Sequence, residues 1–255
     1  MLISVLTFVS WGGSLGHATY EGVRFEFSEQ AAAMRPNEFD PNETELAVIV
    51  SDWPLTDEDV ADGLIEHDLS RLDFVFRNGK IWRVSFMRGI SETSFGDGLK
   101  FEGTVGKRIK GRIFTEGEVD IMGSMVGIDV QVDVAVSSAK DLDARVVARG
   151  KDAEKSEWAQ SLKALAGAIQ AEQADVVKAN LSQDWVRAID EEMYGQVSML
   201  AYSLDIPEQY QVEKVSVNGE NARLYLKTED RLGVARFIKQ GGAWKCDGVS
   251  WKYTW

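Results

Sequence analysis

Residues 210–255, YQVEKVSVNGENARLYLKTEDRLGVARFIKQGGAWKCDGVSWKYTW, decide the fold of the C-terminal part of the chain. They contain four strand-like runs, at 210–217, 222–227, 232–240 and 244–255. Asn218-Gly219 and Gly241-Gly242 are typical of the tight turns that join antiparallel neighbours. The stretch therefore predicts a four-stranded antiparallel sheet.

The last of these runs changes its pattern part-way along. Trp244 and Cys246 alternate before Asp247-Gly248, and the apolar parity shifts after it, on Val249, Trp251, Tyr253 and Trp255. One extra residue in a strand has this effect, so the pattern predicts a β-bulge at Asp247-Gly248. Cys246 is then a small buried hydrophobe in the closing strand.

Three helices are predicted before the sheet. The first runs through AEKSEWAQSLKALAGAIQ, residues 153–170, and the second covers 175–181. The third is expected from Asp184 to Leu204, because apolar residues recur at helical spacing up to Leu204 and Pro207 then ends the pattern. Three helices followed by a curled sheet indicate an α+β cone, an architecture that often encloses a small ligand.

The C-terminal part resembles the nuclear-transport-factor-two-like superfamily, the cystatin-like cone shared with ketosteroid isomerase and polyketide cyclases. The helix pair LKALAGAIQAEQADVVKANLSQDW (162–185) and the closing strand GGAWKCDGVSW (241–251) carry the resemblance. It covers about 100 residues and implies a curved sheet wrapped around three helices. Enzymes, small-molecule binders and interaction modules all use this fold, so it implies no single function.

The cone interior is the place where a ligand site is expected. The residues predicted to line it are Trp185, Tyr194, Tyr202, Trp244 and Trp251. Asp184, Asp190 and Glu192 are the available acids, and an isomerase site would need one of them in an apolar pocket beside a Tyr hydroxyl. An aromatic stripe at helical spacing is more often core, and core packing is the favoured interpretation.

Residues 19–150 form a second, β-rich domain in this interpretation. The predicted strands are 23–27, 45–50, 72–77, 80–86, 99–105, 108–115 and 127–136. Asn78-Gly79 between two of them is the strongest short hairpin signal. Thr56 followed by Asp59 indicates the capped start of one helix over 57–69. The pattern predicts an antiparallel sandwich or partial barrel with one short helix, joined near residue 150 to a cone domain over 151–255. These residues resemble β-rich N-terminal regions of uncharacterised bacterial proteins.

The first 18 residues read as a signal peptide. Leu2 to Val9 is an apolar run about the length of a signal h-region, and Gly16 and Ala18 fit a small-x-small cleavage site before Thr19. No Lys or Arg precedes the run, so a first strand of the folded domain is the alternative. The expectation is a periplasmic or secreted protein, with a cytoplasmic one as the alternative and no transmembrane segment.

Composition limits the chemistry further. The formal net charge of −13 argues against a nucleic-acid partner, because the chain repels phosphate backbones. One cysteine and two histidines leave no cysteine-rich zinc site, no internal disulfide and few imidazole ligands. We therefore expect no metal and no cofactor.

Three local motifs look functional but are better explained structurally. Gly12-Gly13-Ser14-Leu15-Gly16 matches a nucleophile elbow, yet a helix should follow it and the sequence predicts a strand. Glu58, Asp62 and Glu66 share a helix face, which is usually solvated. The basic cluster is expected to offset neighbouring carboxylates on an exposed strand face, and it consists of Lys107, Arg108, Lys110 and Arg112.

These observations favour a non-catalytic binding or interaction protein of bacterial type. Its partner would be a protein or a small apolar ligand. The alternative is an isomerase, cyclase or dehydratase that acts in the C-terminal cone. A third reading is a filled cone that forms a homodimer through the outer face of its sheet.

Overall fold

The computed structural model describes residues 14–37, 40, 42–63, 70–88, 91–96, 98–121 and 123–253. The chain divides into two compact units, the first ending at Ala139 and the second beginning at Lys140. The sequence had indicated a boundary near residue 150. The difference arises from strand β12 (Val146–Arg149), which pairs with β13 (Gln211–Asn218) and so belongs to the second unit.

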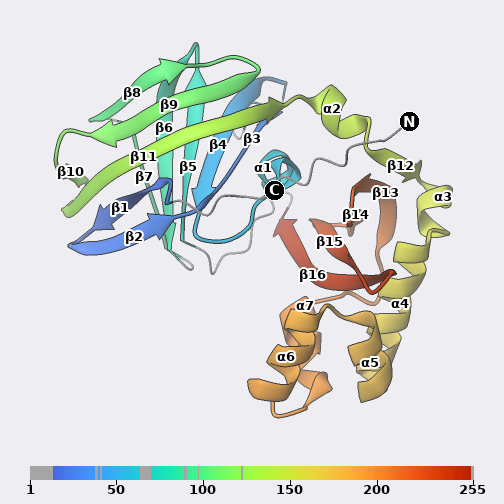
Figure 1. Ribbon diagram of the computed structural model, residues 1–255. Helices are drawn as coiled ribbons and strands as arrows, with labels where there is room; N and C mark the ends of the chain where they lie inside the picture. The colour runs from blue at the N-terminus through green and yellow to red at the C-terminus, as the bar shows by residue number, and fades with distance from the viewer. Residues whose placement is uncertain are drawn as a thin grey trace, which may run out of the picture. The chain divides into compact units, whose positions relative to one another are not determined.

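The first unit is a curled sheet of 11 strands with one helix (Figure 1). Its strands are β1 (Gly16–Tyr20), β2 (Val23–Phe27), β3 (Glu29–Pro36), β4 (Thr44–Ser51), β5 (Arg71–Arg77), β6 (Lys80–Arg88), β7 (Ser91–Phe95), β8 (Leu99–Thr104), β9 (Arg108–Thr115), β10 (Val119–Ile121) and β11 (Ser124–Ser137). The main order is β2-β1-β11-β3-β4-β5-β6-β7, while β9 and β10 pair with β11 and β8 pairs with β9.

The sheet is a half-barrel, in agreement with the partial barrel that the sequence predicted as one of two alternatives, but it is mixed and not purely antiparallel. Its one parallel pairing among the described strands joins β11 to β3, through Val136 with Ala32 and Ser137 with Ala33. The long strand β11 makes this arrangement, because it pairs with β1, β9 and β10 along its first part and with β3 at its end. The seven strands expected in this region are all present, and β1, β3, β7 and β10 are added to them.

Apolar side chains fill the concave side of the half-barrel. The period-two prediction for β11 is confirmed, since Ile128, Val130 and Val132 belong to this core and the alternate Asp129 and Asp133 are exposed on the other face. The core also holds Ala18, Phe27, Val48, Val50, Leu72, Phe74, Phe76, Val84, Phe86, Ile109 and Ile113.

Helix α1 (Asp57–Asp62) packs on the opposite face of β3 and β4, where Val60 contacts their small residues. The predicted capping box is confirmed: the Asp59 amide donates to Thr56 Oγ1 at 3.2 Å, and the Thr56 amide donates to the Asp59 carboxylate at 2.8 Å. The helix ends sooner than predicted, because Gly63 adopts a left-handed conformation with φ of 62°. Residues 64–69 lie outside the described residues, so Glu66 and His67 cannot be placed.

The second unit combines several helices with one sheet, and α3, α4, α5 and α7 contact the strands of that sheet (Figure 1). The helices are α2 (Ala139–Asp143), α3 (Lys151–Glu154), α4 (Glu157–Gln170), α5 (Ala174–Asn180), α6 (Gln183–Glu191), the 3₁₀ turn η1 (Val197–Met199) and α7 (Leu200–Leu204). The strands after β12 and β13 are β14 (Asn221–Lys227), β15 (Arg231–Gln240) and β16 (Ala243–Tyr253). All five strands pair antiparallel in chain order, so the four predicted strands are present and β12 extends the sheet to five.

Local turn chemistry sets the register of this sheet. Gly241 and Gly242 both have positive φ, 59° and 83°, as a two-residue hairpin between β15 and β16 requires. The predicted bulge in the closing strand is confirmed, because Arg236 pairs with Gly248 and Phe237 with Cys246, which leaves Asp247 as the extra residue. The bulge turns the residues on both sides of it toward the helices.

The prediction of one long third helix from 184 to 204 is wrong. Helix α6 ends at Glu191, and the chain then turns through Tyr194 and Gly195, whose φ angles are 51° and 79°. Two successive left-handed residues cannot continue an α-helix, and η1 and α7 resume the path in a new direction. The apolar spacing persisted across the break because both segments pack on the same core.

The N-terminal end of the first unit bears on the signal-peptide prediction. Residues 1–13 lie outside the described residues, and with them the whole apolar run and the first two residues of the Gly12 to Gly16 motif. Gly16, His17 and Ala18 form the first part of β1, and Ala18 is wholly buried in the half-barrel core. No helix within the described ranges is long and apolar enough to cross a membrane.

Candidate functional site

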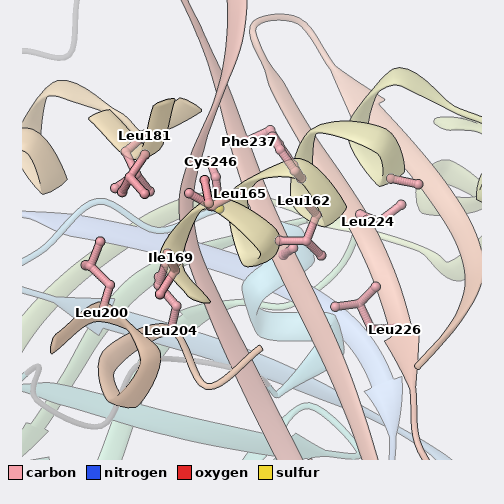
Figure 2. Close-up of a cluster of buried hydrophobic side chains, with 14 of the residues drawn as sticks. Leu162, Leu165, Ile169, Leu181, Leu200, Leu204, Leu224, Leu226, Phe237 and Cys246 are labelled. Carbon is pink, nitrogen blue, oxygen red and sulfur yellow. The ribbon is translucent and has the colours of Figure 1, made fainter. Parts of the chain in front are cut away.

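The interior of the second unit is occupied by side chains where the sequence had suggested a ligand site. Figure 2 shows Leu162, Leu165 and Ile169 of α4 meeting residues of the sheet and of the other helices. The filling residues are at most 5% exposed and include Leu162, Leu165, Ile169, Leu181, Leu200, Leu204, Leu224, Leu226, Phe237 and Cys246. This set is a hydrophobic core.

The three tryptophans predicted to line that interior are partly buried and take part in its packing. Trp185 packs on the core, and its indole N–H donates to the main-chain oxygen of Asp247 at 3.1 Å. Trp244 meets Trp158 edge-on, with ring centroids 5.5 Å apart. Trp251 lies against the core on the far side of the bulge. Each of the three rings therefore contacts other parts of the protein at the place where the sequence had predicted contact with a ligand.

The two tyrosines predicted for the interior lie on the surface. Tyr194 is 84% exposed and Tyr202 is 91% exposed. The expectation that they line the cone is corrected by the helix break, because Tyr194 sits at the left-handed turn itself and Tyr202 follows on the redirected α7. Neither hydroxyl can serve as a donor inside the cone in this conformation.

The acids considered for catalysis are also on the surface. Asp184 forms an ion pair with Arg187 at 2.9 Å, Asp190 forms one with Lys178 at 2.5 Å, and Glu192 is exposed. The described residues contain no group of three or more His, Cys, Asp and Glu side chains placed to hold a metal ion.

Two titratable groups with raised pKa values lie next to each other at the bulge, the buried Cys246 and the partly buried Asp247. Burial raises the pKa of the Asp247 carboxyl above its usual value. Burial also raises the pKa of the Cys246 thiol to about 12, so that this side chain is a protonated hydrophobe at neutral pH. The arrangement lacks the apolar pocket and the tyrosine donor that an isomerase would place beside its carboxylate.

A hollow of about 490 Å³ opens instead at one end of the half-barrel in the first unit. Three connections between strands surround it: the β3–β4 connection with the strand ends beside it, the β5–β6 turn and the β8–β9 turn. Its apolar lining is Met34, Leu46, Phe76 and Val105, and its polar lining is Asn37, Glu43, Thr44, Arg77, Asn78 and Gly79. The volume is typical of small-molecule sites, which often occupy the mouths of β-barrels.

The apolar floor of the hollow continues into the core of the half-barrel. Leu46 and Phe76 are 9% and 3% exposed and belong to both. Phe76 meets Phe101 of β8 edge-on at 5.2 Å between centroids, which ties the floor to the β8–β9 side of the mouth. The base of the hollow is thus the outer edge of the half-barrel core, which Leu46 and Phe76 close.

The β5–β6 hairpin places Arg77 at the end of β5, beside the hollow. Asn78 and Gly79 have positive φ angles of 51° and 74°, which confirms the predicted tight hairpin. Just after the turn the register shifts between Val75 and Phe76, so that Trp82 is an extra residue on β6. The centroid of its ring lies 3.7 Å from the Arg77 guanidinium carbon, a cation–π contact on the sheet face that also carries Glu45.

An ionic row on β3, β4 and β5 adjoins this cation. Glu45 accepts from Arg35 Nε at 3.0 Å, and Arg35 also donates to Asp73 at 2.8 Å. Burial would lower the pKa of the Arg35 guanidinium, but Asp73 and Glu45 outweigh burial and hold this pKa above its usual value. Arg35 is therefore a permanent partner for Glu45, whose carboxylate is only 1% exposed.

The predicted basic cluster lies on the exposed face of β9 and pairs with carboxylates of β11, as expected. Arg112 donates two hydrogen bonds to Asp129, at 2.7 and 2.9 Å, and both Arg108 and Lys110 pair with Asp133. Hydrogen bonds from these cations hold the pKa values of Asp129 and Asp133 below their usual range. The cluster is a neutralised surface, and it offers no anion site.

Comparison with known proteins adds no relative to this picture. No protein-family model matches the chain, and a search of curated proteins finds no match. Sequence reasoning missed the hollow because its lining comes from three separate connections between strands. The one local signal was the pair Asn78-Gly79, which marked the hairpin tip without indicating what it faced.

Proposed function

We propose that the protein is a non-catalytic binding protein that takes a small, largely apolar ligand at the mouth of the half-barrel. One observation carries the proposal: the hollow of about 490 Å³ combines an apolar base with a polar rim. Burial of apolar surface drives such binding, and a few placed polar groups orient the ligand.

The chemistry of the hollow supports binding over catalysis. Its lining has Glu43, Arg77, Thr44 and two asparagines, without a His, Cys or Lys to act as base or nucleophile. Glu43 is exposed at the rim, where water solvates its carboxylate. A site of this composition recognises a ligand by shape and charge.

For the second unit we propose the nuclear-transport-factor-two-like cone with a structural or interaction role. The packing of α4, α5, α6 and α7 on one face of the five-stranded sheet supports the cone. The filled interior supports a role that needs no internal ligand. In this proposal the partner protein binds the sheet face opposite the helices. The partner can be a second copy of the chain. Export of the protein stays a prediction.

Binding of the neutral dye Nile red to the full chain tests the main proposal. Val105→Trp puts a large ring at the hollow, and Val147→Trp makes the same change at an exposed site, 59% exposed, in the second unit. We expect saturable fluorescence enhancement on the wild type, a dissociation constant at least about ten-fold higher for Val105→Trp, and an unchanged constant for Val147→Trp. No saturable binding, or equal loss in both variants, would reject the hollow as the site.

A further inference from the structure

We propose that two copies of the chain form a two-fold symmetric dimer in which β2 pairs antiparallel with β2 of the second copy, with Phe25 on the symmetry axis. None of the residues of β2, Val23 to Phe27, lines the hollow, so this interface is separate from the proposed ligand site. Three features of β2 support the dimer: its position at the edge of the sheet, the direction of its main-chain groups and the order of its charges.

Strand β2 lies at the end of the main strand order and pairs with β1 alone among the described strands (Figure 1). The next strand along the chain, β3, has β4 beside it, but β4 ends at Ser51. Strand β4 runs antiparallel to β3, and a second β2 antiparallel to the first has the same direction. The second copy can therefore continue the sheet where β4 ends.

The main-chain groups of Arg24 and Glu26 point to this edge. The Ser28 N–H donates to the Ser51 oxygen at 3.0 Å, on the side of β4. Main-chain groups alternate in direction along a strand, so those of residues 26 and 24 point to the same side as Ser28. The Phe27 oxygen points the other way and accepts from the Leu15 N–H, just before β1, at 2.7 Å.

These edge groups have no main-chain partner among the described residues. In a dimer centred on Phe25, Arg24 lies opposite Glu26 of the second copy, and their outward N–H and C=O groups face each other. An antiparallel pair of this kind exchanges two hydrogen bonds, and the two-fold axis repeats it. The dimer thus satisfies on both copies the main-chain groups that the edge of a single copy leaves to water.

The side-chain charges select the same register. Arg24 Nε lies 2.5 Å from the Glu26 carboxylate within one copy, and the two side chains are 56% and 53% exposed. Centring the dimer on Phe25 brings each cation opposite the second copy's carboxylate, which gives four charges of alternating sign. Centring it on Arg24 or Glu26 would place like charges directly opposite each other, which is destabilising.

The apolar face of β2 fits this register too. Val23 and Phe25 share the face of Phe27, which belongs to the half-barrel core, yet Val23 is 46% exposed. In the dimer Val23 lies opposite Phe27 of the second copy. The strand also lacks the Lys, Pro or bulge that commonly protects an edge from pairing. Five residues a copy make a small interface, so we expect a dissociation constant of about 1–100 μM.

Sedimentation velocity of the full chain between about 1 and 300 μM tests the dimer. We expect the wild type to change from monomer to dimer over this range. R24E and E26R should each raise the dissociation constant at least about ten-fold, because each places like charges opposite each other at two positions. The double variant R24E/E26R restores opposite charges and should recover the wild-type constant. K100E is the control, since Lys100 is an exposed cation on another edge strand, β8, and pairs with Glu116.

The net charge separates this pairing from general repulsion. The chain carries −13, so E26R makes it less acidic and would strengthen a contact limited by overall charge. Hydrogen exchange of the wild type gives a second test: the amides of Arg24 and Glu26 should exchange more slowly at 300 μM than at 1 μM, and the Phe25 amide should not change. A monomer at every concentration, a dimer unaffected by R24E and E26R, no recovery in the double variant, an equal effect of K100E, or unchanged exchange at Arg24 and Glu26 would overturn the inference.

Discussion

The indole ring of Trp251 lies directly on the backbone of Gly233. The two residues face each other across β15 and β16, and a Cβ atom added to Gly233 would lie 2.5 Å from Trp251 Cε3. The bulge at Asp247 makes this contact, because it shifts the parity of β16 and turns Trp251 toward the helices. Gly233 is therefore needed for space, since its backbone is that of an ordinary strand.

Gly233→Ala should destabilise the second unit. The added methyl group must displace the Trp251 ring, and such overpacking costs about 1–3 kcal/mol. Gly167→Ala in the middle of α4 is the control, because nothing lies within 4 Å of the added atom and the helix gains up to about 1 kcal/mol. Urea unfolding of both variants measures the difference. Equal stability of the two would show that Trp251 does not occupy this position.

Cys246 should be inert in the folded protein. Its side chain is fully buried and burial raises its pKa to about 12, so almost no thiolate is present at neutral pH. We expect a thiol reagent such as 5,5′-dithiobis(2-nitrobenzoate) to react only after unfolding, at a rate that rises with urea. Rapid stoichiometric reaction without denaturant would contradict the packed core of Figure 2.

Asp247 should make the free energy of unfolding of the second unit decrease as the pH rises, which is the opposite of the usual effect of an aspartate. Burial raises its pKa above 3.8, so the folded chain binds this proton more tightly than the unfolded chain does. The free energy of unfolding should therefore fall as the pH rises from 3.8 through the raised pKa. Asp247→Asn removes this titration and should flatten the decline, measured as the urea dependence of Cys246 labelling. An unchanged slope would place the pH dependence elsewhere.

Local sequence patterns predicted much of the fold because local chemistry fixes those features. Asn78-Gly79 and Gly241-Gly242 specify their hairpins, and the parity change at Asp247 specifies its bulge. Strand β3 was missed because Ala31, Ala32 and Ala33 have low strand propensity, and only the pairing with β4 and β11 makes them a strand.

The two larger errors of prediction arise from tertiary packing, which local sequence patterns do not show. A helical stripe continued across Tyr194 and Gly195, since the segments on both sides of the break pack on one core. This moved Tyr194 and Tyr202 from the expected interior to the surface. The candidate site lies in the first unit, where turns distant in sequence come together. No periodic pattern in the sequence indicates such a place.

The most direct test of the binding site is a methyl NMR titration of the full chain with Nile red. The account predicts saturable chemical-shift changes on the methyl groups of Met34, Leu46 and Val105, at the mouth of the half-barrel. It predicts none on Leu165 and Leu200, which fill the core of the second unit. Changes confined to Leu165 and Leu200, with Met34, Leu46 and Val105 unaffected, would contradict it.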